Sequence, residues 1–148
     1  MAMKLPSDFK EFLKLLNASK VEYLLIGGYA VGYYGYPRAT ADLDIWVAAN
    51  TANADRVVAA LKQFGFDSAD LSPGLFLKEW QIVRMGLPPV RIELATTISG
   101  VDFKDCFAHR VVAELDGVQT NLIGLNHLKM NKKASGRHQD IADLEHLP

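Results

Sequence analysis

Residues 24–47, LLIGGYAVGYYGYPRATADLDIWV, place two aspartates inside a stretch that is otherwise mostly apolar. Alternate side chains of a strand share a face, so Asp42 and Asp44 point the same way while Leu43 and Ile45 point to the other side. Two like charges on a partly buried face are costly unless something positive lies between them. The pattern therefore indicates a cation site. Oxygen ligands, without cysteine or a well-placed histidine, favour Mg²⁺ or Mn²⁺ over zinc.

Two further features extend this candidate site. Glu93 is a third carboxylate forced out of an apolar run, between Ile92 and Leu94 in VRIELAT. Three carboxylates can hold two divalent ions about 4 Å apart, which is the geometry of in-line phosphoryl transfer. The pair Gly27-Gly28 follows a predicted strand and precedes a helix, where a phosphate can approach the backbone and the first helical N–H groups. Together these features predict a site for a triphosphate–metal complex.

Each feature also has a purely structural explanation. A Gly-Gly pair after a strand can be only a turn, and an Asp-x-Asp can lie on a solvated edge strand. Glu93 can pair with Arg91, which shares its strand face. The apolar residues that flank the acids argue against simple solvation, so the conjunction favours a functional site. A dinucleotide fingerprint at Ala30-x-Gly32-x-x-Gly35 is rejected, because the first glycines after the strand are adjacent.

The bulk composition is that of an ordinary globular protein. The chain has 148 residues, 49% hydrophobic and 22% charged, with a net charge of -1. We expect one domain over residues 1–148, with no overall electrostatic attraction to nucleic acid. Its single cysteine, Cys106, excludes an internal disulfide. An early run of charges argues against a secretory signal, and no apolar run approaches the roughly 20 residues of a membrane span. We expect a soluble cytoplasmic protein.

The hydrophobic periodicity predicts helices and strands along the whole chain. Helices are expected from Ser7, as an N-cap, to Ser19, at 29–34, from Asn50 or Thr51 to Gly65, at FKDCFAH, and at 125–134 and 137–147. Strands are expected at 21–26 and 43–48, at LFLKEW, QIVRMG and VRIELAT, and in a hairpin turned by Asp116-Gly117. This order predicts an α/β or α+β fold with a mixed β-sheet flanked by helices.

IGGYAV followed by TADLDIWV resembles the nucleotidyltransferase superfamily, which includes DNA polymerase beta, the CCA-adding enzymes and the antibiotic nucleotidyltransferases. The chain is more closely similar to small stand-alone bacterial proteins related to the nucleotidyltransferase toxins of abortive-infection systems. That similarity lies at YGYPRATADLDIWV, RIELATTISGVDF and NKKASGRHQDIADLEHL, and it covers nearly the whole chain. It implies a polymerase-beta-like palm that uses Mg²⁺ or Mn²⁺.

The resemblance also implies a role for each candidate residue. The catalytic residues and metal ligands would be Asp42, Asp44 and Glu93, with Glu93 near the attacking hydroxyl. The nucleotide would be bound by Gly27, Gly28, Arg38, Thr40, Lys132 and Arg137. Arg137 can instead pair only with Asp140 at helical spacing. Relatives commonly carry Asp where this chain has Glu93, and some carry Ser at the position of Gly28.

The activity implied is transfer of a nucleoside monophosphate from an NTP to an acceptor hydroxyl, with release of pyrophosphate. The sequence does not decide whether the acceptor is an RNA end, a protein or a small molecule. It also does not decide whether the protein has a protein partner or forms a homo-oligomer. The alternative is a catalytically weak or inactive nucleotide-binding or toxin–antitoxin-type interaction module on the same fold. Glu93 in place of Asp is the feature that supports this alternative.

Overall fold

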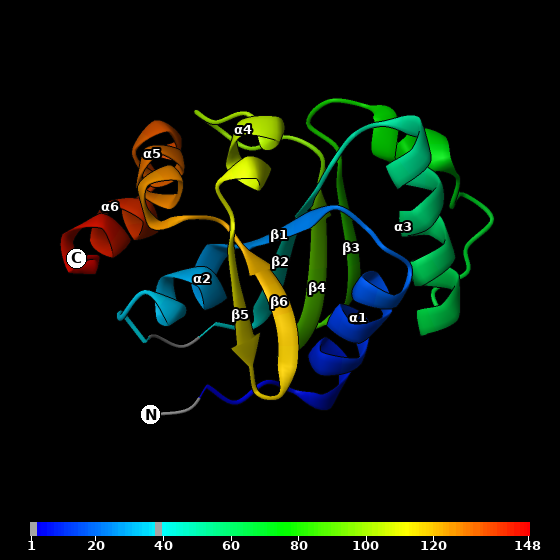
Figure 1. The fold of residues 1–148 in the computed structure, drawn as a ribbon, viewed down its shortest axis with the longest axis horizontal. Coiled ribbons are helices and arrows are strands. Elements are labelled where there is room, and N and C mark those ends of the chain that lie inside the picture. Colours follow the sequence, from blue (N-terminus) through cyan, green and yellow to red (C-terminus); the bar gives the residue numbers. More distant parts are fainter. Residues whose placement is uncertain (1–2, 38–39) are drawn as a thin grey trace.

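The computed structural model describes residues 3–37 and 40–148, which build one six-stranded sheet with helices on both faces (Figure 1). In chain order the elements are α1 (Ser7–Ala18), β1 (Tyr23–Ile26), α2 (Gly27–Tyr33), β2 (Asp42–Val47), α3 (Thr51–Phe64), the 3₁₀ helix η1 (Pro73–Leu77), β3 (Ile82–Leu87), β4 (Val90–Ala95), α4 (Phe103–Ala108), β5 (Val111–Leu115), β6 (Val118–Leu122), α5 (Leu125–Ser135) and α6 (His138–His146). The predicted mixed α+β architecture is confirmed.

The sheet places the acidic strand β2 in its interior. The strand order is β3-β4-β2-β1-β6-β5. Strand β2 runs antiparallel to β1 and parallel to β4, and β1 runs parallel to β6. The candidate acids therefore have strands on both sides and do not lie on a solvated edge, which removes one of the structural explanations considered from the sequence.

Different helices cover the two faces of the sheet (Figure 1). Helices α1 and α3 pack on one face, where Leu43 and Ile45 are fully buried. Helices α2, α4 and α5 pack against the other face, in a second core cluster that includes Trp46. Because strand side chains alternate, Asp42 and Asp44 lie on the same face as Trp46. The apolar flanks of the acids thus build the cores, and the acids remain half-buried beside the second one.

Several predicted local signals are present. The Asn50 side chain caps α3 by accepting a hydrogen bond from the Asn53 N–H at 3.0 Å. Gly65 ends that helix in a left-handed conformation, with φ 104°. The Asp116-Gly117 pair turns the β5–β6 hairpin with φ of 48° and 83°.

Within the parts of the chain that the structure describes, no helix is both long and apolar enough to cross a membrane.

Three local predictions differ from the structure. LFLKEW does not form a strand, because Pro73 begins a 3₁₀ turn whose Phe76 is fully buried in the core. The end of that segment, Trp80, has a left-handed backbone with φ 57°. Ser7 is not the N-cap of α1, because the capping position is Pro6 and no side chain caps the helix. The first strand also begins at Tyr23, two residues later than expected.

Candidate functional site

The three predicted carboxylates lie together on the neighbouring strands β2 and β4. The parallel register places Asp42 opposite Arg91 and Asp44 opposite Glu93. One oxygen of each carboxylate lies within 4.8 Å of the others, and all three residues are half-buried. Among the described residues, no other group of histidines, cysteines and acids converges in this way. The sheet register thus joins residues that are far apart in the sequence.

Asp44 lies in an environment that is short of positive charge. Burial raises the pKa of its carboxyl to about 7, helped by the negative charges of Glu93 and Asp42. A bound cation would relieve both the burial cost and this repulsion. Three converging carboxylates are also the hard oxygen donors that Mg²⁺ and Mn²⁺ prefer. The residues present therefore fit a divalent metal ion.

Two arginines compensate the other two acids. Arg91 makes a two-point contact with Asp42, from Nε to Oδ1 at 3.0 Å and from Nη2 to Oδ2 at 2.9 Å. Arg84 on β3 donates from Nε to Oε1 of Glu93 at 2.7 Å, whereas Arg91 Nη2 lies 3.6 Å from the same oxygen. The pairing of Glu93 with Arg91 that the sequence suggested is present, but Arg84 is the closer partner. Asp42 and Glu93 thus each have an arginine partner, whereas neither of these two arginines pairs with Asp44.

Gly27 lets the Asp44 carboxylate approach the backbone at the start of α2. Its φ is +69°, and a Cβ built on it would collide with the Asp44 side chain. Any other residue would be strained in this conformation and would displace the carboxylate. Gly27 therefore matters to the acidic cluster directly, a role that is separate from the phosphate contact predicted from the sequence.

Two cavities meet at the acids. The first, of about 320 Å³, is bordered by Glu93 together with Trp80, Thr97 and Asn131. The second, of about 230 Å³, is bordered by Gly28, Thr40, Gln139 and Asp140. Five residues border both cavities: Gly27, Asp42, Asp44, Lys132 and Arg137. The arrangement offers space for two reactants on either side of one acidic cluster.

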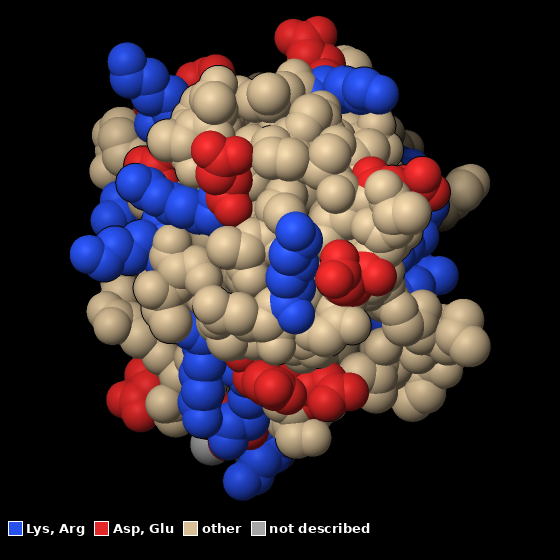
Figure 2. All heavy atoms as spheres, turned by 90° about the vertical axis from the view of Figure 1, so that its right-hand side faces the viewer, with Lys and Arg blue, Asp and Glu red and all other residues tan. Residues whose placement is uncertain are grey.

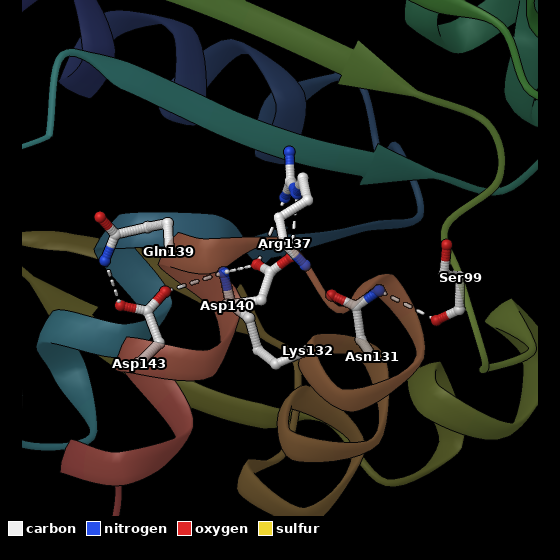
Figure 3. A network of polar contacts seen from close by, with 7 residues as sticks. All are labelled: Ser99, Asn131, Lys132, Arg137, Gln139, Asp140 and Asp143. Carbon is white, nitrogen blue, oxygen red and sulfur yellow. Dashed lines mark hydrogen bonds and ion pairs between the residues drawn. The ribbon is translucent and has the colours of Figure 1, made fainter.

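The predicted phosphate ligands of the C-terminal helices reach the cavities but are already in ion pairs (Figure 3). Lys132 is buried, with Nζ 3.1 Å from Oδ1 of Asp140 and 3.0 Å from Oδ2 of Asp143. Arg137 donates from Nε to Oδ2 of Asp140 at 2.8 Å, and its side chain is 75% exposed. The helical-spacing pair considered from the sequence is therefore present. The exposed Arg137 side chain is the freer of the two to turn toward a ligand.

Asp140 has the opposite electrostatics to Asp44. Its burial alone would raise its pKa, but hydrogen bonds from Arg137, Ser135 and Lys132 outweigh that effect and hold the pKa below its usual range. The Asp140 carboxylate also accepts a hydrogen bond from the backbone N–H of Arg137 at 3.2 Å, at the start of α6. This cluster of charges is complete without a ligand.

The remaining nucleotide-binding candidates border the second cavity or fall outside the described residues. Gly28 is buried in the first turn of α2. The Thr40 hydroxyl donates to the backbone carbonyl of Asp42 at 3.3 Å, beside the acids. Arg38 lies outside the residues that the structure describes.

Several residues that the fold brings to the site are not among those predicted from the sequence. Arg84 lies opposite Glu93 because the β3–β4 hairpin pairs Leu87 with Val90, and that register could have been counted outward from the turn. Trp80 was assigned to a strand and its place at the first cavity was not foreseen. Asp143 completes the pairing of Lys132 from a later turn of α6, for which no sequence signal was apparent.

Solved structures of nucleotidyltransferases share this fold. A candidate nucleotidyltransferase from Thermotoga maritima matches with a TM-score of 0.62 and 15% identity, over 93% of this chain and 88% of that chain. An antigenic nucleotidyltransferase-like protein from Paracoccidioides brasiliensis matches with a TM-score of 0.54 and 20% identity, over 96% and 76%. The lincosamide antibiotic adenylyltransferase LnuA, with lincomycin bound, matches with a TM-score of 0.56 and 13% identity, over 99% and 97%.

No protein-family model matches the sequence, and no curated protein does either. At such low identities the structural likeness shows the fold. The chain therefore has a nucleotidyltransferase fold, as the motifs of the sequence predicted.

Proposed function

We propose that the protein is a metal-dependent nucleotidyltransferase. It would transfer a nucleoside monophosphate from an NTP to an acceptor hydroxyl and release pyrophosphate. The observation that carries this proposal is the convergence of Asp42, Asp44 and Glu93 within 4.8 Å, inside a nucleotidyltransferase fold. The raised pKa of Asp44 supports it, because a half-buried acid beside two other carboxylates is suited to an external cation.

In this proposal Asp42 and Asp44 hold the divalent ions, with Glu93 as the third ligand. The ions would supply the charge neutralisation that phosphoryl transfer needs. The backbone of Gly27-Gly28 and the side chain of Thr40 receive the triphosphate in the second cavity. Arg137 and Lys132 add positive charge there, and Arg38 remains a proposed nucleotide contact. Glu93 also accepts the proton of the acceptor hydroxyl, which makes the oxygen a better nucleophile.

Two arginine contacts favour a second candidate function. Arg91 and Arg84 already satisfy Asp42 and Glu93, as they would in a nucleotide-binding or toxin–antitoxin-type module that does not catalyse transfer. The longer Glu at the third position supports the same candidate. Both proposals share three features that rest on the sequence: the single-domain organisation, the cytoplasmic location and the bacterial abortive-infection context.

The proposal is tested by incubating the protein with each α-labelled NTP, Mg²⁺ and a cell extract, and by measuring both pyrophosphate and the labelled product. We expect release of pyrophosphate and transfer of label by the wild-type protein, and neither by Asp44→Asn or in excess EDTA. Mg²⁺-dependent NTP binding without pyrophosphate release would favour the second candidate. The absence of NTP binding would contradict the proposed transfer and leave, of the second candidate, only an interaction module that does not bind nucleotide.

A further inference from the structure

Trp80 is an exposed residue beside the first cavity, and the core does not explain its position. The residue borders that cavity and is 63% exposed. It belongs to neither hydrophobic core cluster. Its backbone has φ +57°, a left-handed conformation that is unusual for a large side chain. The Trp80 N–H is held there by the Thr97 hydroxyl at 3.0 Å. Strained backbone of this kind clusters at ligand-binding sites.

The two cavities differ in the groups that they alone contain. Glu93, the proposed acceptor of the hydroxyl proton, borders only the first. Gly28 and Thr40, the proposed triphosphate contacts, border only the second. Asp42 and Asp44 lie between the two. This asymmetry assigns the triphosphate to the second cavity and the attacking hydroxyl to the first.

The first cavity offers apolar surface and neutral hydrogen-bonding groups. Its own wall includes Trp80, Ile82 and Ile98, with the neutral polar groups of Thr97 and Asn131. Its volume of about 320 Å³ lies at the lower end of small-molecule sites, which span roughly 300–1,000 Å³.

Cations that could receive the phosphates of a nucleic acid are scarce at this cavity. Among its described lining residues the cations are Lys132 and Arg137, which also border the second cavity and are ion-paired with Asp140. Arg84 and Arg91 are engaged with Glu93 and Asp42. Figure 2 shows the opposite face of the sheet, over α3, where basic and acidic side chains are interspersed and from which no described helix residue borders the cavity. A polyanionic acceptor gains most of its affinity from such cations.

We propose that the first cavity is the acceptor site, that Trp80 is its specificity-determining residue, and that the acceptor is a small molecule with a flat apolar ring and no phosphate groups. The inference rests on the proposed function and narrows its acceptor. The indole stacks on the ring and holds the acceptor hydroxyl near Glu93. That hydroxyl oxygen forms a bond to the α-phosphorus while the bond to the bridging oxygen breaks, pyrophosphate leaves, and the hydroxyl proton passes to Glu93.

The test compares Trp80→Ala and Trp80→Phe with Leu87→Ala, a matched control that removes an exposed apolar side chain from β3 away from both cavities. Each protein receives α-labelled NTP, Mg²⁺ and one of three pools from a cell extract: dialysable small molecules, RNA or protein. Nucleotide affinity is measured separately with non-hydrolysable α,β-methylene NTPs.

We expect the wild-type protein to label the small-molecule pool. Trp80→Ala should lower the rate at limiting pool concentration by about tenfold or more, because an aromatic stack and its buried area are lost. Trp80→Phe should retain most of the rate, Leu87→Ala should match the wild type, and all variants should bind the NTP analogue within about twofold of the wild type.

Three results would overturn the inference while leaving the proposed function intact. They are label in the RNA or protein pool, an unchanged rate in Trp80→Ala, and loss of analogue binding in Trp80→Ala, which would place the nucleobase on Trp80. Failure of the wild-type protein to bind any NTP analogue with Mg²⁺ would instead overturn the proposed function, and this inference with it.

Discussion

Two clusters of charged residues border the second cavity, and the pKa values of their aspartates are shifted in opposite directions. In the C-terminal helices, Lys132 and Arg137 surround Asp140 and hold its pKa below the usual range against the effect of burial. On the sheet, burial and two neighbouring acids raise the pKa of Asp44 to about 7. The first cluster matches its two acids with two cations, whereas on the sheet two arginines pair with Asp42 and Glu93 and Asp44 keeps a raised pKa.

The difference distinguishes a charge cluster that stabilises the fold from one that is suited to bind a ligand. A buried ion pair whose partners are all protein groups resists the loss of any member. An acid cluster without enough counter-charge costs stability and is retained where an external cation or substrate completes it. The contrast predicts that removing the charge of Lys132 and removing the charge of Asp44 change stability in opposite directions.

The largest effect is expected from Lys132→Met, which removes the cation of the complete cluster. It leaves Asp140 and Asp143 buried beside each other without that charge, so we expect a loss of about 3–5 kcal/mol. Chemical denaturation measures it. Lys133→Met, at an exposed position on the same helix, should change stability by less than about 0.5 kcal/mol. A similar small loss in both variants would mean that the ion pair at Lys132 contributes little.

A smaller loss is expected from Gly27→Ala, at the acidic cluster. The new Cβ collides with the Asp44 carboxylate and strains a positive φ, so we expect a cost of about 2 kcal/mol and loss of Mg²⁺-dependent NTP binding. Gly117→Ala is the control, because its φ is also positive but its Cβ would meet nothing within 4 Å. If both variants keep NTP binding, Gly27 has no part in shaping the site.

Asp44→Asn should act in the other direction and stabilise the metal-free protein near pH 8 by more than about 1 kcal/mol, because each pKa unit by which folding raises the pKa of this carboxyl costs about that much at this pH. The Asp44 carboxyl has a folded pKa of about 7, above its ordinary value of 3.8. Its contribution to stability is therefore present below the lower value and is lost as the pH rises through the higher one. The neutral Asn escapes that loss.

The gain from Asp44→Asn should therefore be larger at about pH 8 than at about pH 4. Thermal melts in EDTA at the two pH values measure it. A variant that is less stable than the wild type at both pH values would show that Asp44 is a structural residue.

The smallest effect on stability is expected from Glu93→Gln. Its closest ion pair is with Arg84, whose side chain is 57% exposed, so we expect a change of only about 0–1 kcal/mol. Turnover should fall by a factor on the order of 10², the scale of a positioned base, while most NTP binding remains. Glu93→Asp should keep or raise turnover. The measurement compares the rate of pyrophosphate release with the NTP affinity of each variant. A fully active Glu93→Gln would exclude Glu93 from catalysis.

Much of the fold could be predicted because its signals are local. The apolar flanks of Asp42 and Asp44 specified a buried strand, and the Asp116-Gly117 turn specified a hairpin. The failure at LFLKEW has a physical reason, since an apolar run of that length suits a buried 3₁₀ turn as well as a strand. Periodicity does not distinguish the two cases.

The candidate site could be predicted from the sequence only where a charged residue stands in an otherwise apolar run. Asp42, Asp44 and Glu93 stood out as acids in apolar runs, and the sheet brings them together. Arg84 and Trp80 are ordinary residues of an exposed segment, and their position depends on register and on a loop conformation. The register of the β3–β4 hairpin could have been counted from its turn, whereas the loop conformation at Trp80 leaves little trace in one sequence.

Above all, we propose that the acidic cluster is completed by a metal ion carried with an NTP. Isothermal titration of wild-type protein and Asp44→Asn with α,β-methylene NTPs, each with Mg²⁺ or with EDTA, tests it most directly. We predict binding by the wild type only with Mg²⁺, and no binding by a folded Asp44→Asn. Equal binding with and without Mg²⁺, or equal binding by the two proteins, would contradict the claim.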